Sequence, residues 1–248
     1  MPRGKVAWIT GGGSGIGLAG GIELAKAGAH VIISGRSKET LAAAEKQIKA
    51  VGSGEAIALD VANKDDVAEV AAKIGRVDIL VNSAGINSPR RNLHNVSLES
   101  WDQIVAVNLS GMFYCVHAVL PGMRSRKDGL IINISSWAGR YASTLTGPGY
   151  NATKHAVVAL TESINLEECA NGIRATSVLP GEVATPILEK RPVPPTPEVR
   201  ARMLQAEDLG KTLLFVASLP ARACVNEIII SPTWNRFYLG GLESPPKA

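Results

Sequence analysis

A tyrosine and a lysine stand four residues apart in the stretch Tyr150-Asn151-Ala152-Thr153-Lys154. Four residues is close to one helical turn, so the Tyr150 phenol and the Lys154 ammonium would lie on the same helix face. A tyrosine near its reference pKa of about 10 is a poor proton carrier at neutral pH, and a fixed neighbouring cation favours the phenolate. The pair is therefore a candidate general acid and base for a hydroxyl group. Because a packed ring beside a solvated lysine has the same spacing, the rest of the chain must support this interpretation.

A glycine-rich stretch from Thr10 to Gly17 separates the first apolar run from the first helical pattern. Glycines there let the backbone turn tightly and approach a phosphate, while the start of a helix offers free N–H groups. The spacing is G-x-x-x-G-x-G and not the more common G-x-G-x-x-G of dinucleotide sites. We expect this turn to bind a cofactor through Gly11, Gly13, Ser14, Gly15, Ile16 and Gly17.

The second apolar run ends in Ser34-Gly35-Arg36-Ser37, without the acid that often binds the adenosine ribose. Arg36 would instead suit a 2′-phosphate, and a charge-assisted hydrogen bond of this kind contributes about 1.5–3 kcal/mol. This pattern favours NADP(H), with Arg36 and Ser37 as contacts. NAD(H) is the alternative if Arg36 is an ordinary exposed turn residue.

Short apolar runs alternate with helical patterns along nearly the whole chain. Strands are expected at residues 6–10, 31–34, 56–59, 79–82, 130–134, 174–179 and 225–231. Helices are expected at about 15–28, 65–74, 98–123, 150–172 and 207–217, and a further helix through Leu41, Ala44 and Ile48 is expected to stop at Gly52. This alternation indicates an α/β fold of the doubly wound Rossmann type, a parallel sheet with helices on both faces, whose ligands bind at the carboxyl ends of the strands.

The composition indicates one folded domain over residues 1–248, with 19% charged and 46% hydrophobic residues. Five prolines between 186 and 197 predict an irregular, lid-like insertion at about 183–205, and 232–248 is expected to be an irregular tail. The net charge of +4 is scattered and aromatic residues are few, which argues against a nucleic-acid partner.

Cysteine usage and the start of the chain both favour the cytoplasm. The three cysteines, at 115, 169 and 224, are far apart and are expected to be buried free thiols. The first strand begins so early that no signal peptide is expected, and no apolar run is expected to approach transmembrane length, so we expect no membrane association. Four isolated histidines predict no metal site, and the lack of G-x-S-x-G argues against a serine hydrolase.

From about Lys5 to Ser231 the chain resembles the short-chain dehydrogenase/reductase family. The resemblance is carried by the glycine turn, by YxxxK at Tyr150 and Lys154, and by Asn82-Ser83-Ala84-Gly85, in which Ser83 departs from the family's NNAG. It implies cofactor contacts at Asp60, Val61, Asn82, Ala84, Gly85, Tyr150, Lys154, Pro180, Gly181, Val183 and Thr185, and a catalytic set of Asn108, Ser136, Tyr150 and Lys154. The end of the chain, at Pro232-Thr233-Trp234, lacks the family's usual glycine-rich segment.

The resemblance also implies hydride transfer between a nicotinamide and a carbonyl or alcohol carbon. Ser136 would orient the substrate oxygen, Tyr150 would exchange its proton, Lys154 would hold the phenolate charge and bond the nicotinamide ribose, and Asn108 would steady a water chain. We expect an NADP(H)-dependent reductase of ketones or aldehydes that forms a homodimer or homotetramer through helices near 101–123 and 150–170. The alternatives are an NAD-dependent alcohol dehydrogenase and a catalytically silent NADP-sensing binding protein.

Two groups of residues bear on the substrate. Arg90, Arg91, Lys190 and Arg191 would either bind an anionic or acyl-carrier substrate or be ordinary surface charges. Trp137 would either form a wall of an apolar or aromatic substrate pocket or pack in the core.

Overall fold

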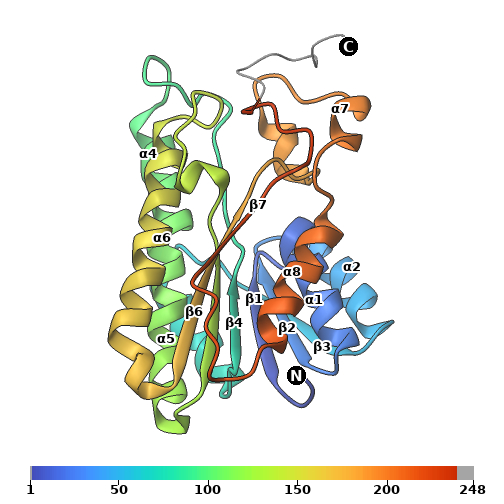
Figure 1. Cartoon of the computed structure of the whole chain (residues 1–248), viewed down its shortest axis with the longest axis vertical. Coiled ribbons are helices and arrows are strands. Elements are labelled where there is room, and N and C mark those ends of the chain that lie inside the picture. The colour runs from blue at the N-terminus through green and yellow to red at the C-terminus, as the bar shows by residue number, and fades with distance from the viewer. Residues whose placement is uncertain (1, 239–248) are drawn as a thin grey trace.

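A computed structural model describes residues 2–238, so the final ten residues of the predicted tail lie outside the described residues. Seven parallel strands form one sheet in the order β3-β2-β1-β4-β5-β6-β7 (Figure 1). The strands are β1 (Val6–Thr10), β2 (His30–Gly35), β3 (Ser53–Ala58), β4 (Ile79–Asn82), β5 (Gly129–Ile134), β6 (Ile173–Pro180) and β7 (Glu227–Ile230). The chain crosses from β3 over β1 to β4, which confirms the doubly wound α/β fold.

Helices cover both faces of this sheet. One layer contains α1 (Gly15–Lys26), α2 (Lys38–Lys49) and α8 (Ala206–Ser218). The other contains α3 (Lys64–Ile74), α4 (Leu98–Val105), α5 (Gly111–Arg126) and α6 (Pro148–Glu168). Figure 1 shows α1, α2 and α8 on one side of the strands and α4, α5 and α6 on the other. Each layer buries its own apolar cluster against the sheet, and each fully buried large aliphatic side chain contributes about 1.5–3 kcal/mol.

The third strand and the proline-rich insertion differ from the sequence expectation. Strand β3 begins at Ser53, three residues earlier than expected, because the polar start of this edge strand pairs through its backbone with β2. The insertion contains a 3₁₀ helix, Pro186–Lys190, and helix α7, Pro197–Ala201. Both begin with a proline, which is tolerated at the first helical position because no N–H is needed there.

Helices α4 and α5 are joined by a π-helical turn, Ala106–Ser110, into one continuous helix, Leu98–Arg126. Contrary to the sequence expectation, this 29-residue helix is long and apolar enough to cross a membrane by length and composition. Its apolar face is in the core of the domain, where Val116, Val119 and Met123 are buried.

The sequence predicted three free and buried thiols, and the prediction of burial is wrong for two of them. All three thiols are free, but only Cys115 is buried, whereas Cys169 and Cys224 are exposed. They lie just after α6 and just before β7, where the chain runs over the surface.

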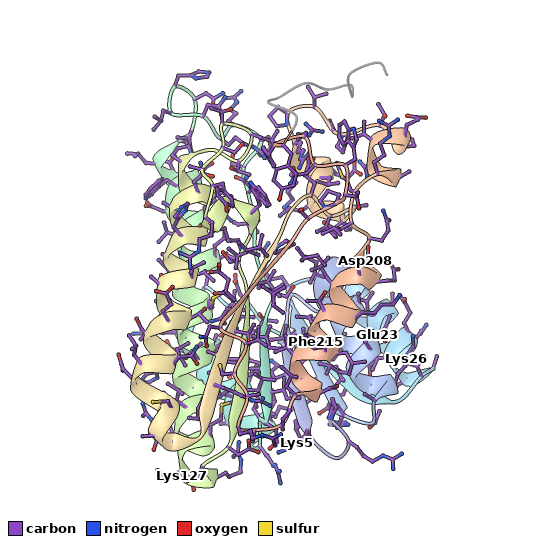
Figure 2. The ribbon with its side chains drawn as sticks, in the orientation of Figure 1. Lys5, Glu23, Lys26, Lys127, Asp208 and Phe215 are labelled. Carbon is purple, nitrogen blue, oxygen red and sulfur yellow. The ribbon has the colours of Figure 1, made fainter. Side chains whose placement is uncertain are left out.

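Buried polar side chains attach α6 to the sheet near the carboxyl ends of the strands. Asn82 on β4 donates to Asn133 on β5 over 2.9 Å, and Asn133 donates to Thr161 on α6 over 2.9 Å. Figure 2 labels Lys5 and Lys127 at the opposite end of the sheet, where Lys5 binds Asp128 at 2.6 Å. The first set of contacts holds in place the helix that carries Tyr150 and Lys154.

Candidate active site

A cavity of about 290 Å³ opens at the carboxyl ends of the central strands, between the glycine turn and the start of α6. Most of the predicted site residues line it: Gly11, Ser14, Gly15, Ile16, Ala84, Gly85, Ser136, Tyr150, Lys154, Pro180, Gly181, Val183 and Thr185. The predicted residues outside its lining are Gly13, Gly17, Arg36, Ser37, Asp60, Val61, Asn82 and Asn108. The cavity therefore brings together segments as far apart in the sequence as those of Gly11 and Phe237.

Helix α6 begins where a backbone contact requires a glycine. Gly147 has φ +76°, and a Cβ there would overlap the backbone oxygen of Arg91. Pro148 follows at the first helical position, so Tyr150 lies in the first turn of α6 and Lys154 one turn later. The Lys154 Nζ lies 5.4 Å from the centroid of the Tyr150 ring, which confirms that the two side chains share one face of the helix.

The charges around Tyr150 differ from the sequence expectation. Burial raises the pKa of the Tyr150 phenol, and the Ser136 side chain, Arg191 and Arg91 only partly offset this rise. Lys154 is itself buried, which lowers the pKa of its ammonium to about 8, and its Nζ donates to the Ile134 carbonyl over 2.8 Å. The expected net acidification of the phenol is therefore not found, because burial outweighs the neighbouring cations, and the phenol is protonated at neutral pH.

The two adjacent serines after β5 have separate functions. Ser135 is buried and its hydroxyl donates to the Lys154 carbonyl over 2.8 Å. Both serines line the cavity, but the Ser136 hydroxyl accepts from the Ala138 N–H at the start of a short 3₁₀ helix, Trp137–Gly139, and interacts with the Tyr150 phenol. Ser136 is thus the serine that is available to a ligand beside Tyr150.

Asn108 and Asn82 do not point into the cavity. Asn108 lies in the π-helical turn, a wide turn that is frequent at functional sites, and its amide exchanges hydrogen bonds of 2.8 and 3.0 Å with the backbone of Ile86. A role for Asn108 in ordering water would therefore use its main chain. The Asn82 side chain is in the buried network that holds α6.

The glycine turn fits a dinucleotide through close backbone packing. Gly11 has φ +66°, and a Cβ there would lie 2.7 Å from the Ala84 nitrogen. A Cβ on Gly17 would lie 2.5 Å from the Gly11 oxygen. With Ser14 at its N-cap, α1 begins at the cavity, and its first N–H groups and dipole suit a bound pyrophosphate. The residues present therefore fit the phosphates of a dinucleotide.

Arg36 and Ser37 lie next to this turn, at the carboxyl end of β2. Arg36 is exposed directly after the strand. The Ser37 hydroxyl already caps α2 by accepting from the Thr40 N–H and donates to Glu39 over 2.9 Å. Glu39, a carboxylate that the sequence analysis missed, therefore lies next to the predicted 2′-phosphate contact. The sequence feature that could have indicated Glu39 is its position two residues after Ser37, in the first turn of a helix, where acids are favoured.

Asp60 and Val61 follow β3 on the same side of the crevice. The Asp60 carboxylate accepts from the Ala62 N–H over 3.1 Å, and Leu59 is bonded to Gly35 at the end of β2. The predicted cofactor contact at Asp60 therefore lies beside β2, the strand that ends one residue before Arg36.

Several cavity residues were not among the predicted site residues, including Asn87, Glu182 and Phe237. Asn87 is buried and donates to the Thr146 carbonyl over 3.0 Å. Glu182, which follows the Pro180-Gly181 motif, is almost fully buried. Phe237 comes from the segment after β7 and stacks on Trp137 with ring centroids 6.0 Å apart. The described start of the tail thus docks at the cavity. Asn87 and Glu182 stand beside the predicted motifs at residues 82–85 and 180–181, whereas no motif near Phe237 indicated its position.

Comparison with known proteins agrees with this arrangement. The family model for short chain dehydrogenase matches residues 5–194. An uncharacterized oxidoreductase of Staphylococcus saprophyticus is 33% identical over 234 residues, which cover 92% of this chain and 97% of the relative.

Two solved structures show the same fold with cofactors bound. A metagenomic short-chain oxidoreductase in complex with NADP is 31% identical, with a TM-score of 0.81 and coverage of 94% of this chain and 99% of that chain. The 3-ketoacyl-(acyl-carrier-protein) reductase of Brucella melitensis, complexed with NADH, is 31% identical, with a TM-score of 0.82 and coverage of 93% and 98%. The glycine turn, the YxxxK helix and these matches lead to one conclusion: the chain belongs to the short-chain dehydrogenase family and is an oxidoreductase of the kind that uses a nicotinamide cofactor.

Proposed function

We propose that this protein is an NADP(H)-dependent reductase of ketones or aldehydes, and that Asn108, Ser136, Tyr150 and Lys154 form its catalytic set. The observation that carries the proposal is the shared cavity, in which Ser136, Tyr150 and Lys154 face the glycine turn. A reductase needs a proton donor at neutral pH, and the raised pKa of Tyr150 keeps its phenol protonated.

Each residue has a separate task in the reduction. When bound, the reduced nicotinamide supplies the hydride that reaches the carbonyl carbon. Ser136 donates a hydrogen bond that orients the carbonyl oxygen, and Tyr150 gives that oxygen its proton. Lys154 stabilises the phenolate that remains, because its ammonium is held one helical turn away by the Ile134 carbonyl.

The cofactor preference rests on Arg36. Its exposed guanidinium at the end of β2 would bind a 2′-phosphate, while the glycine turn and the start of α1 would bind the pyrophosphate. Glu39 opposes this preference through its negative charge next to Ser37. Since the related structures contain NADP in one case and NADH in the other, the proposal depends on this chain's own residues.

Initial rates with NADPH and NADH over a panel of ketones and aldehydes test the proposal. We expect turnover of at least one carbonyl compound and a higher kcat/KM with NADPH. A clear preference for NADH would replace the proposal by the NAD-linked dehydrogenase. Tight NADP(H) binding without turnover of any carbonyl or alcohol would replace it by the cofactor-sensing protein.

The proposal includes self-association through α5 and α6. Phe113 on α5 and Leu166 on α6 expose 48% and 81% of their surfaces, although both are large apolar residues. Light scattering should give a mass of two or four chains, and charged substitutions at these two positions should lower it. We also propose a cytoplasmic location, which the three free thiols support.

A further inference from the structure

A buried arginine without a carboxylate partner lies in the wall of the cavity. Arg91 is only 6% exposed, and its guanidinium donates to two backbone carbonyls, those of Leu145 and Lys190, over 3.4 and 2.6 Å. Its Nε has no hydrogen-bond partner. Within residues 2–238, no carboxylate lies within ion-pair distance of this group. Burying a charge without a counter-ion is costly, so such a site suits an anion that arrives with a ligand.

A second arginine lines the same cavity from the insertion. The Arg191 side chain is 12% exposed and pairs with Glu182 at 2.8 Å. Glu182 is shared, because Arg236 also pairs with it at 2.9 Å. One carboxylate therefore serves two of three neighbouring guanidinium groups, and the cluster keeps an excess of positive charge.

Both arginines lie close to the proposed proton donor. The charges of Arg191 and Arg91 each favour the phenolate of Tyr150 and so partly offset the rise in its pKa that burial causes. The exposed neighbours Arg90 and Lys190, in contrast, do not line the cavity. Of the four basic residues considered in the sequence, the structure thus brings only Arg91 and Arg191 to the cavity.

Aromatic side chains form another part of this wall. Trp137 packs against Tyr141 and Phe237, with ring centroids 4.7 and 6.0 Å apart, and both Trp137 and Phe237 line the cavity. A ligand held here would meet cations at one end, hydrocarbon along its length and the Ser136 and Tyr150 hydroxyls at its reacting carbon.

We propose that the substrate is an oxo acid, whose carboxylate binds Arg91 with help from Arg191 while its carbonyl faces Ser136 and Tyr150. This inference rests on the proposed reductase function and names its substrate class. The corresponding product is a hydroxy acid: the carbonyl carbon gains a hydride from the reduced nicotinamide, which is oxidised, and the oxygen gains the Tyr150 proton.

The test uses matched substrates that differ only in charge. Pyruvate, acetoacetate and levulinate vary the distance between carboxylate and carbonyl, and each is compared with its methyl ester under NADPH. We expect at least one acid to exceed its ester in kcat/KM by about tenfold or more, as a charge-assisted contact predicts. Equal or better use of all three esters would overturn the oxo-acid inference while the reductase proposal stands.

Arg91→Gln tests whether Arg91 binds the substrate carboxylate or only joins two loops through its hydrogen bonds to the Leu145 and Lys190 carbonyls. We expect kcat/KM for the preferred acid to fall about 10- to 100-fold with a small effect on its ester. Arg90→Gln, the exposed neighbour, is the matched control and should change neither. Equal losses for acid and ester would show that Arg91 only joins the two loops through Leu145 and Lys190. Arg191→Gln should show a smaller effect of the same kind and supplies a second variant if Arg91→Gln does not fold.

A binding measurement keeps the inference testable without turnover. Butyrate, compared with butyramide at equal ionic strength, should raise the melting temperature of the NADP-loaded wild-type protein but not of Arg91→Gln. If no carbonyl compound is reduced, the reductase proposal fails. The difference between butyrate and butyramide in melting temperature then decides by itself whether the anion site exists. Equal effects of the acid and the amide would overturn it.

Discussion

The two ends of the crevice are built differently: at the glycine turn the backbone packs so closely that no side chain would fit on two of its glycines, whereas around Tyr150 charged side chains are buried. Gly11 and Gly17 leave no room for a Cβ, so the phosphate end of the crevice is shaped by steric exclusion. At the other end Lys154 and Arg91 are buried cations, and the partly buried Tyr150 phenol has a raised pKa. Close packing makes the glycine-turn end rigid, which suits a cofactor shared by many enzymes. At the Tyr150 end the buried charges control the chemistry and can select a substrate.

Loss of the phenol should have the largest effect. Tyr150→Phe removes the proton donor but leaves the ring that packs beside Lys154, so we expect kcat to fall about 10²- to 10⁴-fold. Cofactor affinity, measured by fluorescence titration, should stay unchanged because the glycine turn is untouched. Unchanged turnover would remove Tyr150 from the mechanism and weaken the electrostatic description of this end.

Adding a methyl group in the glycine turn tests whether the close packing there leaves no room for a side chain. Gly11→Ala must adopt φ +66° and pushes its Cβ to 2.7 Å from the Ala84 nitrogen, so we expect a loss of about 3 kcal/mol in the free energy of unfolding and of NADP binding. Gly4→Ala is the matched control, since Gly4 has φ +74° but nothing within 4 Å of a Cβ. It should lose only about 1–2 kcal/mol from backbone strain. Similar losses in urea titrations of the two variants would refute steric exclusion.

Arg36 is the exception at the glycine-turn end, because there a side chain would discriminate between cofactors. Arg36→Asp should weaken NADP binding about 10- to 100-fold and leave NAD binding nearly unchanged. Glu39→Gln should act in the opposite direction and more weakly, since it removes the negative charge next to Ser37. Calorimetric titration with both cofactors measures each effect. Equal weakening of NADP and NAD by Arg36→Asp would exclude a contact with the 2′-phosphate.

The smallest expected effect is the pH dependence of the free energy of unfolding that comes from the buried Lys154. It tests whether burial disfavours charge at the Tyr150 end of the crevice. Burial lowers the pKa of Lys154 to about 8, below its unfolded value of about 10.4, so between these values the unfolded chain binds more protons than the folded one. Stability of the cofactor-free protein therefore rises with pH in this window, at up to about 1.4 kcal/mol per pH unit.

The measurement compares wild type with Lys154→Met in urea at pH 7.5, 8.5 and 9.5. Subtracting the variant cancels the Cys115 thiol and the Tyr150 phenol, whose raised pKa values act in the opposite direction. We expect the difference to shift by about 1–2 kcal/mol in favour of wild type as the pH rises. A flat difference would show that the Lys154 ammonium is not destabilised by burial.

Local sequence patterns determined the elements and the parts of the site that lie within one element. The strand-turn-helix around Gly11, the one-turn spacing of Tyr150 and Lys154, and the alternation of strands and helices all depend on residues close in the chain. Short-range sterics and helix geometry were therefore enough to predict them. The polar start of β3 was missed because an edge strand is held by backbone pairing and not by burial.

Only the tertiary structure decided which charges are buried and what they contact. Arg91 and Arg191 lie a hundred residues apart, next to the exposed Arg90 and Lys190, and no local pattern distinguishes the buried pair from the exposed one. The same holds for Lys154, whose lowered pKa comes from burial, and for Asn108, whose amide is bonded to Ile86. Desolvation depends on everything that packs around a group, and that packing is set by segments far away in the sequence.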